Sequence, residues 1–305
     1  DSTTNMIWKA ATAPTCACRR ARTSSSKRST RRGAPISGAT PSTIGATWCP
    51  PVGYGDAKCV VSGLQMDYRR FQSQAQLACY TNERDAIREY DATTPITTNL
   101  MGTFKDLDYF EWAKEMDVVS WDNYPGMDTP PSFTAMCHDL MRGIKNQNFW
   151  VMEQQCGPCG WQTLGNTPEP GQVRLCTYQS LAHGAEAIVY FRWRSPLHGT
   201  EQYWHGLLDH DGVGRRRYRE IAALGKELAG LDDLFVGARN TSQVALIKSY
   251  DNAWSHQAQP HSLSFDYNRL LQAYYTGLRA AHAAVDVTSV ETDFSHYRLV
   301  LMPAF

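Results

Sequence analysis

The stretch "DVVSWDNYPGMDTPPSFTAMCHDLMRGIKNQNFWVMEQ" (117–154) decides the fold, because it contains a strand, a helix and a second strand in succession. Residues 117–124 and 149–154 are short, mostly apolar runs typical of buried strands. Residues 132–147 between them carry apolar side chains at helical spacing. Two strands joined by a helix in this way are expected to be parallel, with a right-handed connection.

The same pattern continues on both sides of this stretch. We predict strands at 95–100 and 185–193 and helices at 66–90, 103–116 and 171–184. The four strands end at Asn99, Asp122, Glu153 and Arg192, spaced 23, 31 and 39 residues apart. Each strand is mostly apolar and finishes in a polar residue, as in a (β/α)8 barrel, whose catalytic groups lie at the carboxyl ends of the strands. A doubly wound sheet would also place its site there, but no glycine-rich phosphate turn follows any of these strands.

A second α/β unit is expected after the polar connection at 230–242. Residues 243–251 are typical of a strand, 264–284 of an amphipathic helix, and 285–291 and 297–305 of two further strands. The predicted fold class is therefore α/β, the C-terminal part of a (β/α)8 TIM barrel followed by the beginning of a second α/β domain. The expected domains are an atypical segment at 1–62, the barrel part at 63–236 and the incomplete second domain at 237–305.

Composition excludes several classes of protein. Lys+Arg and Asp+Glu both number 30 in 305 residues, which gives no indication of a nucleic-acid or anionic-membrane partner. No apolar run approaches the roughly 20 residues of a membrane helix, and the first residues lack the apolar segment of a secretory signal. Nine Cys, an odd number in a long chain, favour a reduced, cytoplasmic protein.

Residues 1–55 differ from the rest of the chain. They contain eight Lys/Arg but one acidic residue, Asp1, and the first Glu of the protein is Glu83. The segment has neither helical nor strand periodicity. Two interpretations stay open: a disordered basic arm, or out-of-frame translation of GC-rich DNA, which produces this mixture of Arg, Ala, Ser, Thr, Pro and Cys.

Two adjacent features compete for the chemistry of the chain. Cys156-Gly-Pro-Cys159 has the spacing of a thioredoxin redox pair, but the Gly- and Pro-rich residues 160–171 cannot continue a helix, so the pair is expected in a loop. There is no second CxxC to complete a zinc site. Glu153, at the end of a strand near aromatic residues, suits cleavage of a glycosidic bond, which requires two carboxylates. The alternative for Glu153 is a salt bridge that only caps the strand.

From Leu64 to Phe305 the chain resembles the β-galactosidases of glycoside hydrolase family 42. The resemblance rests on seven motifs in family order: "MDYRRFQS", "PITTNLMG", "LDYFEWAKEMDVVSWDNYP", "VMEQQ", "VRLCTYQSLAHGAEAIVYFRWR", "EQYWHGLLDHDG" and "YRLVLMPA". It implies a retaining enzyme acting on terminal β-galactosides such as lactose, with no required cofactor. It also implies that a full-length member forms a homotrimer through a second domain.

The resemblance also implies roles for individual residues. Glu153 corresponds to the nucleophile, Trp161 to the wall of the sugar site, and Glu201 to the carboxylate that holds sugar hydroxyls, with a loop ion pair as the alternative for Glu201. Further candidates for contact with substrate are residues at the rim of the strands: Phe191, Arg192, Asp122, Asn123 and Asn99. His205 is also a candidate, because Trp204, directly before it, stands where the family has His.

The general acid/base of the family is not found. It is the Glu of an Asn-Glu-Tyr motif upstream of the matched region, and residues 1–55 contain no Glu. Asn82-Glu83 imitates the dipeptide but is expected on the solvated face of helix 66–90. Members can also hold a structural zinc in this region, whereas Cys16, Cys18 and Cys49 do not reproduce its ligands, so no metal is predicted. The alternatives to an active enzyme are an impaired fragment and, more remotely, a CxxC redox protein.

Overall fold

The computed structural model describes residues 62–126, 128–160, 165, 167–235 and 237–305. The chain divides into two compact units, residues 1–90 and 91–305. In the first, the described residues form the single long helix α2 (Ser62–Arg88), which confirms the helix predicted at 66–90. Glu83 is exposed on it, as expected.

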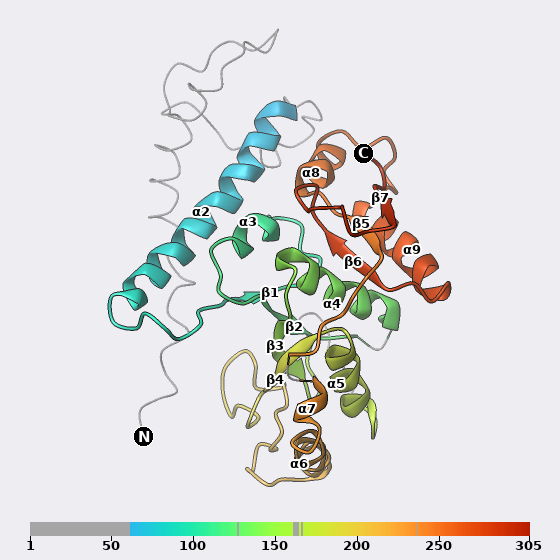
Figure 1. The fold of residues 1–305 in the computed structure, drawn as a ribbon. Helices are drawn as coiled ribbons and strands as arrows, with labels where there is room; N and C mark the ends of the chain where they lie inside the picture. The colour runs from blue at the N-terminus through green and yellow to red at the C-terminus, as the bar shows by residue number, and fades with distance from the viewer. Residues whose placement is uncertain (1–61, 127, 161–164, 166, 236) are drawn as a thin grey trace. The chain divides into compact units, whose positions relative to one another are not determined.

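The first half of the second unit is a four-stranded sheet. All neighbouring strands are parallel and the order follows the chain, β1-β2-β3-β4, with helical connections (Figure 1). This is the predicted arrangement of barrel strands. The elements are β1 (Asn99–Leu100), α3 (Tyr109–Ala113), β2 (Ser120–Asn123), α4 (Pro131–Lys145), β3 (Phe149–Gln155), α5 (Gln172–Ala182), β4 (Ala185–Phe191), α6 (Arg216–Leu228) and α7 (Asp232–Phe235).

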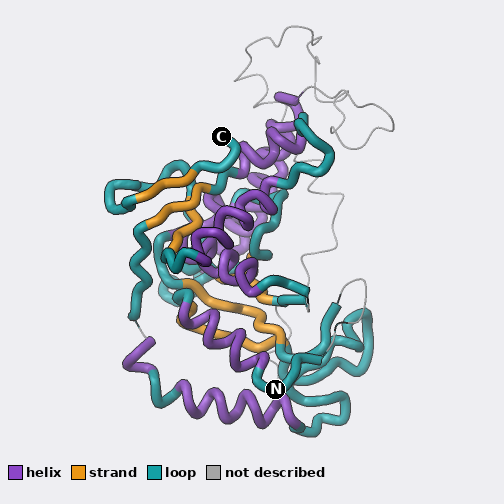
Figure 2. The backbone as a smooth tube through the Cα atoms, turned by 90° about the vertical axis from the view of Figure 1, so that its right-hand side faces the viewer, coloured by secondary structure: helices purple, strands orange, loops and turns teal. Residues whose placement is uncertain are grey.

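The second half contains a separate three-stranded parallel sheet, in which β5 lies between β6 and β7. Figure 2 shows the strands of the two sheets in orange with helices between and around them. The elements are β5 (Val244–Ile247), α8 (Tyr250–Ala258), α9 (Tyr267–Ala280), β6 (Val285–Thr288) and β7 (Leu299–Leu301). The predicted strand at 243–251 is wrong in its last residues, because Ser249 accepts the backbone N–H of Asn252 and starts helix α8 there.

Helix α4 lies at the joint between the two halves. Every residue from Thr134 to Gly143 is buried, because α4 packs against strand β2 and helix α5 of the barrel part and against β6 and α9 of the second part. A Cβ atom at Gly143 would lie 2.1 Å from the carbonyl oxygen of Val287. Only glycine therefore permits this close approach of α4 to β6.

Arg142 of α4 is the centre of a buried ionic network at the same joint. Its guanidinium donates to Asp139 Oδ1 at 2.5 Å and to Asp286 Oδ1 at 2.7 Å and 3.2 Å. It also donates to the backbone carbonyls of His183 at 2.6 Å and Val285 at 3.0 Å. The five bonds join α4, the end of α5 and strand β6. Burial raises the pKa of Asp139, but hydrogen bonds and charge from His183 and Arg142 outweigh it and hold that pKa below its usual value.

Among the described residues, no helix is both long enough and apolar enough to cross a membrane.

Candidate active site

The carboxyl ends of the four barrel strands bring the predicted rim residues together. Asn99 belongs to β1, Asp122 to β2 and Glu153 to β3. Asp122 and Glu153 are direct partners in the register of the two strands. Because the strands are parallel, their carboxyl ends meet on one edge of the sheet.

Glu153 is held by a hydrogen bond to each of its carboxylate oxygens. The Asn99 amide donates to Oε1 at 3.2 Å, and the Tyr124 hydroxyl donates to Oε2 at 2.6 Å. Burial raises the pKa of Glu153, the Tyr124 bond lowers it, the charge of Glu201 raises it, and Asn99 and Arg192 lower it; the net shift is upward. The two donors fix the orientation of the carboxylate, as a nucleophile requires.

Tyr124 is a site residue that the sequence analysis missed. Its side chain lies two residues beyond Asp122, so strand alternation places both on the same face. The motif "DNYP" therefore held the signal, since the rim continues one residue past the predicted Asp122 and Asn123. Burial, then the hydrogen bond to Glu153, raises the pKa of Tyr124 well above its ordinary value, so Tyr124 acts as a donor at neutral pH.

Asp122 and Asn123 have different surroundings. Burial, followed by the charge of Glu153, raises the pKa of Asp122 to about 8. Its Oδ1 atom is buried and has no hydrogen-bond partner among the described residues. The Asn123 amide instead donates to Gln154 Oε1 at 2.9 Å in the interior. Asn123 therefore joins strands β2 and β3, and its role in contacting substrate stays a prediction.

Arg192, Phe191 and Glu201 form a group beside the carboxylate. Arg192 Nη1 lies 3.2 Å from Glu201 Oε2, and both side chains are about one-third to two-fifths exposed, at 37% and 40%. The guanidinium carbon of Arg192 is 5.1 Å from the centre of the Phe191 ring, which in turn lies edge-on to the Tyr124 ring at 6.2 Å. This pair matches the ion-pair alternative for Glu201 and leaves polar atoms accessible near Glu153.

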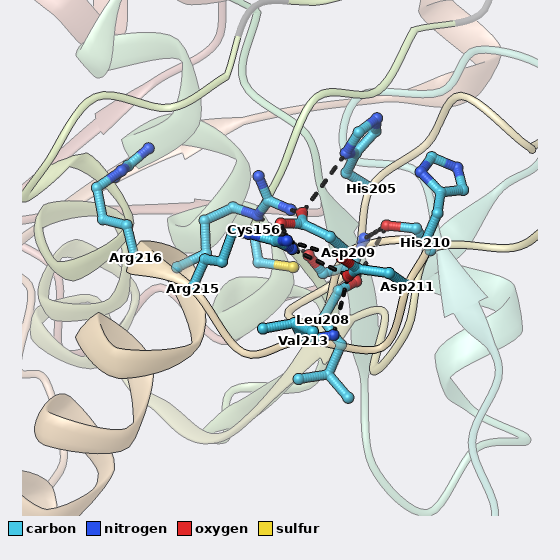
Figure 3. A network of polar contacts seen from close by, with 12 residues as sticks. Cys156, His205, Leu208, Asp209, His210, Asp211, Val213, Arg215 and Arg216 are labelled. Carbon is cyan, nitrogen blue, oxygen red and sulfur yellow. Dashed lines mark hydrogen bonds and ion pairs between the residues drawn. The ribbon is translucent and has the colours of Figure 1, made fainter.

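His205 belongs to a different set of contacts. Its ring packs edge-on against His210 at 4.9 Å, and Nδ1 is 4.0 Å from Asp209 Oδ1. Figure 3 shows Asp209 at the centre of this network, with Arg215 Nη1 2.8 Å from its Oδ2. A contact of His205 with sugar stays a prediction. Trp161 lies outside the described residues.

The Cys156–Cys159 pair lies in a loop after β3, as predicted. The Cys156 thiol is buried and donates to the Phe191 carbonyl at 3.0 Å, which links the ends of β3 and β4. Burial raises the pKa of Cys156 to about 12 and that of Cys159 to about 11. Both thiols are therefore poor nucleophiles at neutral pH, and the geometry disfavours the redox alternative.

Within the described part of the chain, no three His, Cys, Asp or Glu side chains gather in a way that could hold a metal ion. Cys16, Cys18 and Cys49 lie outside that part, so the absence of a metal stays a prediction.

Comparison with known proteins identifies the family. The "Beta-galactosidase" model of glycoside hydrolase family 42 matches residues 50–231, more than half of the chain. The chain belongs to glycoside hydrolase family 42. The family 42 match is followed by one to the β-galactosidase trimerisation domain at residues 242–305. The family match thus begins inside the segment expected at 1–62.

The family 42 relatives cover most of this chain. A β-galactosidase of Planococcus sp. (strain L4) is 45% identical over 244 residues, which are 79% of this chain and 36% of the relative. The crystal structure of the β-galactosidase from Bacillus circulans sp. alkalophilus has 44% identity and a TM-score of 0.77, and covers 79% of this chain and 36% of that one. The β-galactosidase from Halorubrum lacusprofundi has 35% identity and a TM-score of 0.75, and covers 79% of this chain and 38% of that one. The chain therefore spans little more than a third of the length of these relatives.

Proposed function

We propose that the chain carries the nucleophile side of a retaining β-galactosidase site. Glu153 attacks the anomeric carbon of a terminal β-D-galactoside, the bond to the leaving oxygen breaks, and a covalent galactosyl-enzyme forms. Water then releases galactose with retained configuration. The observation that supports this proposal is the pair of hydrogen bonds from Asn99 and Tyr124 that orients the Glu153 carboxylate at the strand ends.

The neighbouring polar residues are proposed to hold the sugar. Glu201 and Arg192 present partly exposed polar atoms beside Glu153, which suits adjacent sugar hydroxyls. Phe191 supplies an apolar ring edge next to Tyr124. The remaining candidates rest on the resemblance to the family: Trp161, Asn99, Asp122, Asn123 and His205.

An impaired activity is the alternative that the sequence itself favours. Protonation of the leaving oxygen needs a second carboxyl group, which the resemblance assigns to the Glu of an Asn-Glu-Tyr motif. The dipeptide Asn82-Glu83 imitates that motif but contains the first Glu of the chain, and Glu83 is exposed on α2. The chain is then able to form the galactosyl-enzyme only from substrates whose leaving group needs no proton. Translation of the encoding DNA in all three frames checks the origin of residues 1–55: an Asn-Glu-Tyr motif in another frame supports a frame shift, and its absence from all three rules it out.

The test uses 2,4-dinitrophenyl β-galactoside with and without azide, because this leaving group needs no acid and azide needs no base. The expected result is a burst of dinitrophenol and a β-galactosyl azide product, both lost in Glu153→Gln. Glu169→Gln, a change of an exposed carboxylate, is the control. A folded chain without a burst, or a burst that persists in Glu153→Gln, would refute the proposed role of Glu153.

We also propose that the full-length protein is a cytoplasmic homotrimer that acts on β-galactosides such as lactose. The match of residues 242–305 to the trimerisation domain supports the assembly. Sedimentation of the full-length protein tests it: a mass of three protomers is expected, and a monomer at micromolar concentration contradicts it.

A further inference from the structure

The loop between β1 and α3, residues 101–108, carries no proposed catalytic group but begins directly after the strand of Asn99. That strand has only two residues, Asn99 and Leu100, and pairs with β2 alone among the described strands. So short a strand has few backbone hydrogen bonds to hold its residues in place. The position of the Asn99 amide against Glu153 therefore depends on how the following loop is held.

The second α/β part holds this loop by three polar contacts. The Trp254 indole N–H donates to the Lys105 carbonyl at 2.6 Å, and the Asn268 amide donates to the Thr103 carbonyl at 2.8 Å. Lys105 Nζ lies 2.6 Å from Asp266 Oδ2. Two of the three contacts are to backbone carbonyls, so they constrain the path of the loop itself.

The groups that make these contacts are themselves fixed. Trp254 is 2% exposed, and Asp266 caps helix α9 by accepting the Arg269 N–H at 3.0 Å. The oxygen of the Asn268 side chain accepts from the buried Lys248 ammonium at 3.1 Å, which leaves its NH₂ group directed to Thr103. The orientation of all three groups is thus determined within the second part.

The loop is also confined from the barrel side. Gly102 has a φ of +57°, and a Cβ atom there would lie 3.1 Å from Cys137 Sγ of helix α4. The Met101 N–H donates to the Tyr109 hydroxyl at 2.9 Å, and the Tyr109 ring packs edge-on against Tyr250 of α8 at 6.1 Å. The loop is consequently held between α4 and the second sheet's helices.

We propose that Trp254, Asn268 and Asp266 are positioning residues of the active site, which act through the 101–108 loop to keep the Asn99 amide on Glu153. The second α/β part then has a role in the geometry of the nucleophile in addition to any role in assembly. This inference rests on the proposed function for its relevance to catalysis, while the positioning itself is a property of the chain.

The test measures the pH dependence of the azide reaction in two conservative variants. Trp254→Phe keeps an aromatic ring and removes the N–H, and Asn268→Asp keeps the acceptor for Lys248 and removes the donor to Thr103. Because the Asn99 bond lowers the pKa of Glu153, the acid limb of the pH–rate profile, where Glu153 becomes protonated, should move to higher pH in both variants. Lys114→Met is the control, since it breaks the exposed pair with Glu291 across the same two parts (3.1 Å) without touching the loop.

A double variant distinguishes positioning through Asn99 from a general loss of structure. Asn99→Ala should shift the acid limb by the same amount, and adding Trp254→Phe to it should shift the limb no further. Additive shifts, or an acid limb in Trp254→Phe equal to that of the wild type, overturn the inference.

A second readout needs no activity. The titration of the Glu153 carboxyl, followed by ¹³C NMR and assigned by its loss in Glu153→Gln, should show the same upward shift in Trp254→Phe and Asn99→Ala but not in Lys114→Met. An inactive chain with this pattern would refute the proposed function and support the positioning role. Identical titrations in all four proteins would refute the positioning role even in an active enzyme.

Discussion

At the scale of single residues, the carboxylate of Glu153 is oriented by two donors, one in strand β1 and one in the residue that directly follows β2. Asn99 reaches one oxygen and Tyr124 the other. Position and residue type were enough to predict Glu153, Asn99 and Asp122 at the rim, because each is a polar residue near the end of a mostly apolar run. The role of Tyr124 as a donor was not predicted, since the hydrogen bond joins residues 29 positions apart and depends on the register of β2 and β3.

Tyr124→Phe is expected to slow the reaction with the activated galactoside by about tenfold or more, because a hydrogen bond to a charged group contributes about 1.5–3 kcal/mol. It should also move the acid limb upward, since this bond lowers the pKa of Glu153. Tyr178→Phe is the matched control, because Tyr178 makes the same kind of bond to the exposed Glu227, also at 2.6 Å. Equal reaction rates and equal acid limbs of the pH–rate profiles in the two variants would contradict the role of Tyr124 as a donor to Glu153.

Asp122→Asn is expected to change how stability depends on pH. The pKa of Asp122 is raised in the folded protein from 3.8 to about 8, so the wild type loses stability as pH rises through this window. The variant lacks this loss and should gain a few kcal/mol over the wild type between about pH 4 and pH 8. Urea denaturation at the two pH values measures the difference, and a constant difference would show that Asp122 ionises normally.

At the scale of elements, apolar periodicity predicted the type of most helices and strands but placed several ends wrongly. The helix expected from residue 103 begins only at Tyr109, because the Asp108 carboxylate accepts the N–H groups of Phe110 and Glu111 and caps it there. The residues before it form the loop that the second α/β part holds. The residues that contact this loop lie about 150 positions further along the chain. A local sequence pattern cannot predict contacts over such a separation.

Lys248 follows strand β5 and is fully buried, with its ammonium 4.5 Å from the Tyr250 ring and 3.1 Å from Asn268 Oδ1. Burial lowers its pKa to about 8, while the charges of Asp108, Cys137 and Asp266 raise it and that of Lys105 lowers it. Below that pH the folded protein holds a buried charge, so the wild type gains stability as pH rises from about 8 to about 10.5.

Lys248→Met is therefore expected to be most favourable, relative to the wild type, at about pH 7. The free energy of unfolding of the variant relative to the wild type should fall by about 3 kcal/mol between about pH 7 and about pH 10.5, because the pKa of Lys248 is lowered by roughly 2.5 pH units on folding. The measurement is urea unfolding of both proteins across this range. Lys226→Met, which removes an exposed lysine of α6, is the control for the loss of a lysine side chain. A difference between Lys248→Met and the wild type that does not change with pH would mean that Lys248 titrates normally.

At the scale of the whole molecule, the two sheets share helix α4 as a common layer. The sequence predicted two α/β parts in the right order, because the strands and helices of each are local patterns. It did not predict the ionic network that joins them, since Arg142 and Asp286 are 144 positions apart and both resemble ordinary surface charges in the sequence. Burial of the whole of α4 is similarly visible only once both sheets are in place.

Arg142→Met is expected to destabilise the chain by about 3–5 kcal/mol at about pH 7, because it removes the guanidinium that two buried carboxylates share. Asp139 keeps its contacts with His183 and Tyr275, and Asp286 keeps those with Ser242 and Tyr297. The cost should shrink as pH falls towards about 4. In the wild type, the lowered pKa of Asp139 stabilises the folded state at pH values above the pKa of an ordinary Asp side chain. This stabilisation is lost as the pH falls into the acid range. In the variant, Asp139 loses the charge of Arg142, which lowers its pKa in the wild type, and it therefore protonates more readily.

Urea unfolding at the two pH values tests this expectation. Arg174→Met is the matched control, since Arg174 pairs with Glu227 at the surface and should matter little at either pH. A cost for Arg142→Met that is independent of pH would indicate a packing effect rather than a charge effect.

The sharing of α4 has a consequence for engineering. A recombination point placed at the linker near residue 237 would separate Asp286 from Arg142, and Val287 from the glycine that lets it approach α4. A chimera between two relatives should fold well only when the grafted C-terminal part comes with the α4 of the same parent. The inherited module is thus the second sheet together with a helix that lies about 100 residues before it in the chain.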